Sequence, residues 1–389
     1  MTRFAATTDL FATWAEGIES SLDDAQALAA LPDEIRSFPP LALRDAVQIV
    51  GEHMTDWRWK ELIRTLKDAD QLQSTPGGQH RISLAQLHAW METEGIRPSR
   101  PPGVDRAIRV AVENFKGGAG KSTTCLHLAH GLALRGYRVL VIDTDPQASV
   151  SRLLGIQPHR LDVADTLACI VDSPPTPLKP RATHIDGLHI VPASMGLTNL
   201  EVSILSMFRD NQGDRIGPLM ESAFASVEAD YDIILCDFQP AFSLMQTFLL
   251  HAMDSLFVPL PTETPDFAGT GDFLSQIQQF VSSIERIVGK PKVWDPVLVV
   301  HTRRKKSGDL VHNLAGRVFG IHRPPEYIED SAAISSALAC LKSVYEAGAD
   351  QYDPRAIKRA REQVDNVVDV VASAIVARWA EMTGDSHDK

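Results

Sequence analysis

Residues 107–149 read AIRVAVENFKGGAGKSTTCLHLAHGLALRGYRVLVIDTDPQAS, and this stretch decides the fold. Ile108–Val112 is a short, mostly apolar run that predicts a buried strand, and a glycine loop follows it directly. Apolar residues at helical spacing then predict a helix from about Ser122 to Arg135, ended by Gly136. Val139–Ile142 is the next buried strand. A strand, loop, helix and strand in this order predict an α/β fold with a mostly parallel, doubly wound sheet.

The glycine loop has the composition of a phosphate-binding P-loop. Its glycines let backbone N–H groups turn around a phosphate, and the N-terminus of the following helix adds a partial positive charge. The Lys121 ammonium is expected to reach the β- and γ-phosphates, and the Ser122 hydroxyl to bind Mg²⁺. The predicted nucleotide-binding residues of the loop are Lys116, Gly117, Gly118, Ala119, Gly120, Lys121, Ser122 and Thr123. A glycine turn without a ligand is the alternative.

The loop departs from the common pattern G-x-x-x-x-G-K-[ST] at its start. Phe115 occupies the first glycine position and Lys116 stands next to it. A loop with lysines at both ends resembles the deviant P-loop of the ParA/MinD superfamily. The resemblance implies a homodimer in which Lys116 reaches the nucleotide of the partner subunit, with ATP and Mg²⁺ as cofactors.

Acidic residues follow two of the predicted strands. Asp143 and Asp145 lie in the string DTDPQA, where two carboxylates could serve a magnesium ion and its waters at the ligand-binding edge of the sheet, or could only cap a helix. The run 231–237 is an apolar strand that ends in Asp237, as a Walker B element does. By the resemblance, Asp145 orients the attacking water, while Asp143 and Asp237 join Ser122 in supporting magnesium. Lys116, Lys121 and Asp145 are then the catalytic residues. At Gln239 the chain departs from the family, which usually has proline there.

The whole chain has the composition of a globular protein. It contains 389 residues, of which 44% are hydrophobic, and its four cysteines form no CxxC pair, which fits a reducing cytosol. We expect no signal peptide, membrane span or membrane partner. The net charge of −12 argues against a protein that coats DNA through its overall field, so any DNA contact must come from a local basic patch.

Four regions are predicted along the chain. Residues 1–40 contain a helix over about 8–31, which either pairs with the same helix of a second subunit in a dimer or packs on the next domain. Residues 41–96 form a small all-α, winged helix-turn-helix domain that precedes the ATPase domain. Residues 97–104 are a proline-rich linker. Residues 105–389 form the ATPase domain with a long C-terminal helix.

The region 41–96 carries candidate DNA-binding residues. Short helices joined by tight turns suit a helix-turn-helix, and residues 74–81 could be its wing. An ordinary helical domain with a solvated basic face is the alternative. The string RISLAQLH at 81–88 resembles the end of the DNA-binding domain in the plasmid RepA branch of the family, which favours the first interpretation. The candidates are Arg58, Lys60, Arg64 and Arg81.

Three later strings also resemble the RepA branch. Residues 259–274 contain D-F-x-x-T-x-x-F-L, and residues 331–346 begin with SAAIS and end in VYE. At the end of the strand predicted over 296–302, the family places the adenine, so Thr302 or Arg303 is expected to line the base pocket. Arg303, Arg304, Lys305 and Lys306 form the densest basic cluster, interpreted either as a nonspecific DNA contact or as a solvated loop. The final helix carries one apolar face, which predicts core or dimer packing rather than a membrane-binding helix.

Together these strings indicate a resemblance to plasmid-partition ATPases of the ParA/RepA, or RepABC, type. It implies an ATP-bound sandwich dimer that binds DNA nonspecifically in the cytoplasm, at the nucleoid. A ParB/RepB-type centromere-binding protein would stimulate a slow ATP hydrolysis and release the DNA. The N-terminal domain would bind an operator and repress the protein's own operon. A nucleotide-responsive transcriptional repressor that needs no hydrolysis is the alternative function.

Overall fold

The structure is a computed structural model. It describes residues 36–68, 73–74, 80–172, 175–241, 243–289, 291–348 and 353–384, together with residues 13, 16–18, 20 and 21. The chain divides into two compact units, residues 1–37 and 38–389. The helix predicted over 8–31 lies largely outside the described residues, although the six that are described there are helical.

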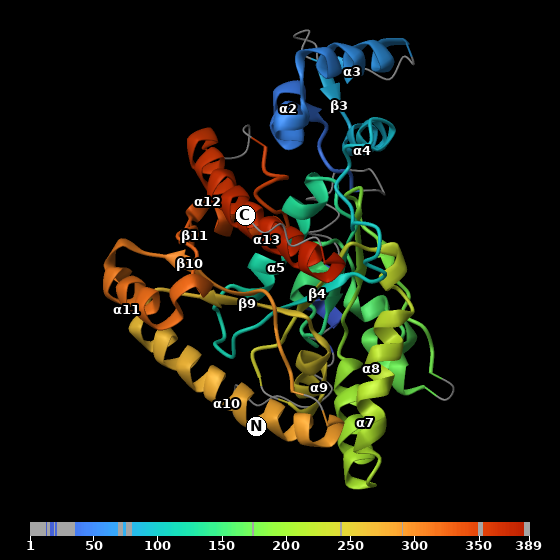
Figure 1. Ribbon diagram of the computed structural model, residues 1–389, viewed down its shortest axis with the longest axis vertical. Coiled ribbons are helices and arrows are strands. Elements are labelled where there is room, and N and C mark those ends of the chain that lie inside the picture. Colours follow the sequence, from blue (N-terminus) through green and yellow to red (C-terminus); the bar gives the residue numbers. More distant parts are fainter. Residues whose placement is uncertain are drawn as a thin grey trace. The chain divides into compact units, whose positions relative to one another are not determined.

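An eight-stranded sheet forms the centre of the second unit (Figure 1). Its strand order is β11-β10-β9-β4-β8-β5-β7-β6, and every neighbouring pair is parallel except β6 with β7. The strands are β4 (Ile108–Val112), β5 (Val139–Asp143), β6 (Arg181–Ala182), β7 (Leu188–Val191), β8 (Ile233–Asp237), β9 (Ser255–Leu260), β10 (Val297–Arg304) and β11 (Tyr327–Glu329). The predicted mostly parallel α/β fold is therefore confirmed.

Helices cover both faces of this sheet, because its central strands alternate their side chains between two cores. Val110 and Val112 of β4 belong to one core, while Ala111 belongs to the other. The first core is covered by α5 (Lys121–Leu134), α12 (Ala332–Ala339) and α13 (Pro354–Thr383). The second is covered by α7 (Leu197–Arg209), α8 (Ile216–Ala225), α9 (Leu244–Ala252), α10 (Thr264–Val288) and α11 (Asp309–Phe319). The short α6 (Ser149–Leu153) follows the acidic turn.

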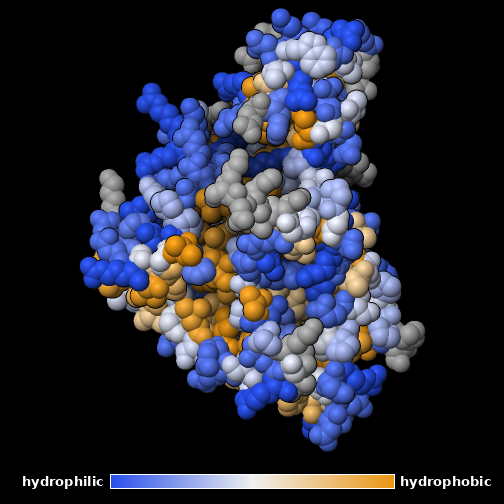
Figure 2. Space-filling view, viewed as in Figure 1, coloured by the Kyte–Doolittle hydropathy of each residue, from blue (hydrophilic) through white to orange (hydrophobic). Residues whose placement is uncertain are grey.

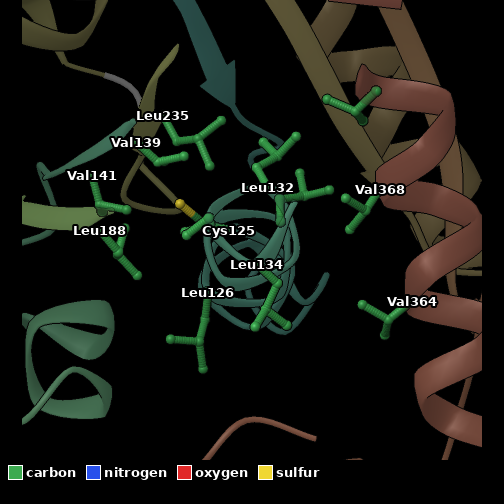
Figure 3. Close-up of a cluster of buried hydrophobic side chains, with 14 of the residues drawn as sticks. Cys125, Leu126, Leu132, Leu134, Val139, Val141, Leu188, Leu235, Val364 and Val368 are labelled. Carbon is green, nitrogen blue, oxygen red and sulfur yellow. The ribbon is translucent and has the colours of Figure 1, made fainter. Parts of the chain in front are cut away.

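The helix after the glycine loop lies in the middle of the first core. In Figure 3, α5 has Val139, Val141, Leu188 and Leu235 of the sheet on one side and the α13 residues Val364 and Val368 on the other. All eight apolar residues predicted along the final helix are buried: Ile357, Ala360, Val364, Val367, Val368, Val371, Ile375 and Trp379. The apolar face of α13 is therefore used inside the chain. No helix among the described residues is long and apolar enough to cross a membrane.

The surface of the second unit is mixed in polarity. Figure 2 shows hydrophilic residues over most of the face drawn there and a hydrophobic area near its middle. The exposed large apolar side chains of the chain include Leu310 and Val318 of α11 and Ile321 in the turn after it. Apolar side chains on a surface are usual in globular proteins, so neither the hydrophobic area in Figure 2 nor these exposed side chains assign a site by themselves.

The region 41–96 is not all helical, which corrects the expectation of an all-α domain. It contains α2 (Leu43–Val50), α3 (Asp56–Asp68) and α4 (Leu84–Thr93), and also a three-stranded antiparallel sheet of β1 (Leu41–Ala42), β3 (His80–Ile82) and β2 (Gln73–Ser74). Pairing of β1 with β3 explains the difference, since short strands of two or three residues leave no periodic signal. The winged helix-turn-helix assignment itself stays a prediction.

The segment predicted as a linker packs against the sheet domain. The Arg97 Nε donates to the Gly136 carbonyl at 2.8 Å, and the Arg100 backbone N–H donates to the Asp232 carboxylate at 3.2 Å. Val104 is buried in the first core. Residues 97–104 therefore fix the preceding helix α4 against the end of α5. Farther along, residues 158–171 form three short 3₁₀ helices, whose residues 167–170 are buried in the second core.

Candidate functional site

The glycine loop connects the carboxyl end of β4 to the start of α5, as predicted. Gly118 and Gly120 have φ values of +78° and +84°, a left-handed conformation that glycine adopts without strain. Thr302 donates its hydroxyl to the Ala119 carbonyl at 2.9 Å, and Arg303 Nη1 donates to the Gly118 carbonyl at 2.9 Å. The structure thus brings Thr302 and Arg303 onto the loop, although they are far from it in the sequence.

Lys121 is buried inside the loop and is 5% exposed. Its Nζ donates to the carbonyls of Asn114, at 2.7 Å, and of Lys116, at 3.3 Å. Burial lowers the pKa of Lys121, while Glu113 and then Asp237 oppose that change. The ammonium therefore has neutral carbonyls as hydrogen-bond partners in the loop, and a phosphate would be a stronger, charged partner.

Lys116 has different surroundings from Lys121. Its side chain is 42% exposed, and its Nζ lies 3.5 Å from Asp266 of α10. A pocket of about 270 Å³ opens beside it. The lining residues are Lys116, Gly117, Gly118, Pro261, Glu263, Pro265, Asp266, Arg303 and Lys305. Lys116 therefore lies at the rim of the loop, beside this pocket.

The two carboxylates of the acidic turn are used differently. Asp143 is fully buried and accepts three hydrogen bonds, from the Asp145 N–H at 3.1 Å and from the Ser151 N–H and hydroxyl at 2.9 and 2.7 Å. Burial raises the pKa of Asp143 to about 6, against the effect of these bonds. Asp145 accepts the Gln147 N–H through its Oδ1, at 2.9 Å. Asp143 therefore shapes the turn, and Asp145 has a second oxygen for other partners.

Asp237 ends β8 beside the loop strand, since it pairs in register with Val112 of β4 and Asp143 of β5. Its carboxylate is fully buried, and within the described residues neither oxygen accepts a well-formed hydrogen bond. Burial raises its pKa well above the usual value, Asp143 raises it further, and Ser122 and Lys121 lower it. Among the described residues, the Ser122 hydroxyl is the side-chain donor that acts on this buried carboxylate, and a cation or its water would give the two oxygens the further partners that burial requires.

Magnesium would find the donor types that it prefers here. Ser122 offers a hydroxyl at the start of α5, and Asp237 offers the oxygens just described. Within the described ranges, no three His, Cys, Asp or Glu side chains are arranged to hold a metal ion by themselves. At P-loop sites magnesium takes much of its shell from phosphate oxygens and water. The residues present therefore fit a magnesium ion that arrives with a nucleotide.

The basic cluster after β10 is largely paired with acids. Lys305 lies 2.6 Å from Glu263 and 3.8 Å from Asp330. Arg304 stacks over the Tyr327 ring and lies 3.6 Å from Asp309. Lys306 begins a 3₁₀ turn, and its side chain lies outside the described part of the structure. The cluster is therefore less free to meet phosphates than its sequence indicates.

The candidate DNA-binding residues of 41–96 also separate into two groups. Arg58 donates to the His53 carbonyl at 3.0 Å and lies 3.4 Å from Glu94, and Arg81 donates to the Pro40 carbonyl at 3.2 Å. Lys60 and Arg64 are exposed on α3, although Arg64 pairs with Glu61 one turn away. Of the four candidates, Lys60 and Arg64 thus present their charges most openly.

Two side chains that position the loop were not singled out from the sequence. Asn114 is buried, donates to the Pro259 carbonyl at 2.8 Å and accepts the Lys116 N–H at 3.1 Å. Asp266 is the acid beside Lys116. Asn114 directly follows an apolar strand, which is a usable signal for a site residue. Asp266 does not directly follow an apolar strand, and the sequence marks it only as the first residue of the string D-F-x-x-T-x-x-F-L that resembles the RepA branch.

Comparison with known proteins places this site in a family. A family model described as an AAA domain matches residues 107–289. The chromosome partitioning protein ParA of Caulobacter vibrioides is 30% identical over 281 residues, which are 68% of this chain and 97% of that protein. The chain belongs to the ParA family of partition ATPases.

Other relatives and solved structures match this ParA-family chain as well. The putative replication protein A of Rhizobium rhizogenes is 29% identical over 333 residues, which are 79% of this chain and 80% of that protein. A solved structure described as a partition protein covers 95% of this chain and 99% of its own, with a TM-score of 0.63 and 18% identity. An ATP complex of a Cyanothece McdA variant covers 67% of this chain and 97% of its own, with a TM-score of 0.50 and 17% identity. At such identities the two structures show a shared fold alone.

Proposed function

We propose that this chain is an ATP-dependent DNA-partitioning ATPase whose ATP-bound form is a sandwich dimer. The observation that carries the proposal is that the two lysines of one loop have different surroundings. Lys121 is buried among loop carbonyls, whereas Lys116 stands exposed at the rim beside Asp266. This difference supports a role for Lys121 at the chain's own nucleotide and a role for Lys116 at a nucleotide presented by a second copy.

Each site residue has a role in this proposal. Lys121 and the loop bind the phosphates, and Thr302 and Arg303 line the base pocket. Magnesium, held through Ser122 and Asp237 with Asp143 supporting its shell, would neutralise phosphate charge when bound. Asp145 orients the attacking water with its less occupied carboxylate. Lys116 of the second copy completes the catalytic set.

The dimer is the form that binds DNA without sequence preference. Arg303 and its basic neighbours contribute to this contact, and a ParB/RepB-type partner stimulates hydrolysis and so returns the protein to its monomeric form. The γ-phosphate then controls a two-state equilibrium that hydrolysis resets. A protein that works in this way acts in the cytoplasm at the nucleoid. The domain at 41–96 adds operator binding through α3, and with it repression of the protein's own operon.

The test combines duplex DNA binding with measurement of mass. Binding of the full chain to a duplex of arbitrary sequence is measured with ATP, with ADP and without nucleotide, at several salt concentrations, and dimer mass is read in the same samples. Only ATP is expected to produce a dimer and salt-sensitive binding. Lys116→Ala should abolish both, because the lysine that crosses the interface is missing.

Lys358→Ala is the matched control, since it removes an exposed lysine on α13 whose side chain is 78% exposed. It should leave dimerisation and DNA binding unchanged. The competing function is a nucleotide-responsive repressor, favoured by the helices and short strands of 41–96. Sequence-specific DNA binding that ignores both ATP and Lys116→Ala would establish that function and overturn the partition proposal.

A further inference from the structure

Arg303 has a strained backbone at the end of β10. Its φ is +49°, in the left-handed region that residues other than glycine rarely adopt, and the pairing of β10 with β11 is irregular between His301 and Arg304. The side chain donates from Nη1 to the Gly118 carbonyl at 2.9 Å. Such a conformation persists only where the surrounding structure holds it. The contacts of the segment after Arg303 therefore decide where its guanidinium lies.

Thr262 is a buried residue that holds this segment. It is the second residue after β9 and is 2% exposed, and its hydroxyl accepts the Lys305 backbone N–H at 3.1 Å. Gly308 packs closely against the same side chain, and a Cβ added to Gly308 would lie 2.3 Å from both Cβ and Oγ1 of Thr262. Atoms overlap at that distance, so a side chain at position 308 would push residues 305–308 away from Thr262.

This contact joins two parts of the pocket beside the glycine loop. Pro261 and Glu263, the chain neighbours of Thr262, line the pocket, and so do Arg303 and Lys305. An ion pair between Lys305 and Glu263 also joins the two segments, but these side chains are 40% and 57% exposed. Exposed ion pairs contribute little to stability, so the buried hydroxyl of Thr262 is the firmer link.

The lining of the pocket suits the base of a nucleotide. Residues 116–118 are the part of the glycine loop that lines it, whereas Lys121, the expected phosphate ligand, comes at the other end of the loop. Pro261 and Pro265 supply apolar surface, and Arg303 supplies a planar guanidinium of the kind that stacks on aromatic rings. A displaced Arg303 would thus weaken contacts with the base and leave those with the phosphates in place.

We propose that Thr262 is a positioning residue of the nucleotide site: it holds the strained Arg303 against Gly118 and so fixes the surface on which the base of a nucleotide rests. This inference rests on the proposed nucleotide function. It assigns part of the affinity for the base, and none of the affinity for the phosphates, to a buried side chain outside the glycine loop.

The experiment measures the affinity of the full chain for ATP and for inorganic tripolyphosphate, which has three phosphates but no base, both in excess Mg²⁺. Thr262→Val keeps the shape of the side chain and removes the acceptor of the Lys305 N–H. Affinity for ATP should fall about tenfold and affinity for tripolyphosphate should stay within about twofold of the wild type. The matched control is Thr198→Val, which makes the same change at an exposed position on α7 and should alter neither affinity.

Two further variants test the same contact. Gly308→Ala should reproduce the selective loss of ATP affinity, because its Cβ displaces Thr262, and it replaces Thr262→Val if thermal unfolding shows that the latter does not fold. Thr262→Ser keeps the acceptor and should bind both ligands as the wild type does.

An equal loss of affinity for both ligands would indicate a merely structural role and overturns the proposal, as does an unchanged affinity for ATP in Thr262→Val. If the wild-type chain binds neither ATP nor tripolyphosphate, the nucleotide function itself is wrong, which is a distinguishable result.

Discussion

At the scale of single residues, Asp143 and Asp145 of one motif differ in the hydrogen bonds that their carboxylates accept. Asp143 accepts three hydrogen bonds within the turn, whereas Asp145 accepts the Gln147 N–H and is 7% exposed. We expect Asp145→Asn to keep that bond through the amide oxygen and to bind ATP normally. Hydrolysis should fall by about 10² to 10⁴, the usual contribution of a general base. Phosphate release at saturating ATP, compared with analogue affinity, checks this prediction, and wild-type turnover in the variant would contradict it.

Residues of the loop could be predicted from the sequence because their signal is local. Glycines, lysines and Ser122 stand within one short string, and Asp143 and Asp237 each end an apolar strand. The acid beside Lys116 could not be predicted in that way, since Asp266 comes from α10, far along the chain. The same holds for the ion pairs of Arg304 and Lys305, which only the folded chain reveals.

At the scale of elements, α5 and α13 pack closely because Gly131 of α5 has no side chain. A Cβ at Gly131 of α5 would lie 2.5 Å from Val368 Cγ2 and 2.8 Å from the Tyr345 hydroxyl. Alanine favours a helix over glycine by about 1 kcal/mol, but overpacking typically costs about 1–3 kcal/mol. We therefore expect Gly131→Ala to lower the urea midpoint of unfolding.

Gly269→Ala in α10 is the control for this prediction, because nothing lies within 4 Å of the added Cβ. There the helix preference acts alone, so the midpoint should rise slightly. Equal behaviour of the two variants would show that α13 does not pack on α5 this closely.

The elements predicted best were those with strong periodicity or long apolar runs. β4 begins and ends where expected, and α13 buries the expected face. By contrast, α10 was not predicted, although Phe273, Ile277, Val281 and Ile284 recur at helical spacing and are buried. Its sequence was interpreted as a family string and not as a helix. The short strands β6 and β11 could not be predicted, because two or three residues at a sheet edge carry no period.

At the scale of the whole molecule, α4 belongs to two cores. Its residues Leu87, Trp90 and Met91 are buried with α2 and α3, while Leu84 is buried in the core of the sheet domain. His88 is 1% exposed, and its Nδ1 lies 2.5 Å from the Asp186 carboxylate, in the turn before β7. The region 41–96 is thus docked on the ATPase domain through one shared helix.

This docking predicts how residues 97–104 respond to protease. His88→Ala removes the bond to Asp186 and leaves a cavity under α4, so the segment should loosen from Gly136 and Asp232. Limited proteolysis is expected to cut within 97–104 several-fold faster than in the wild type, in keeping with local opening that costs less free energy. The control variant Lys67→Ala changes an exposed position on α3, and it should be cut at the wild-type rate. A proline-rich linker that is flexible in the wild type would be cut equally fast in all three proteins, and the two domains would then move independently.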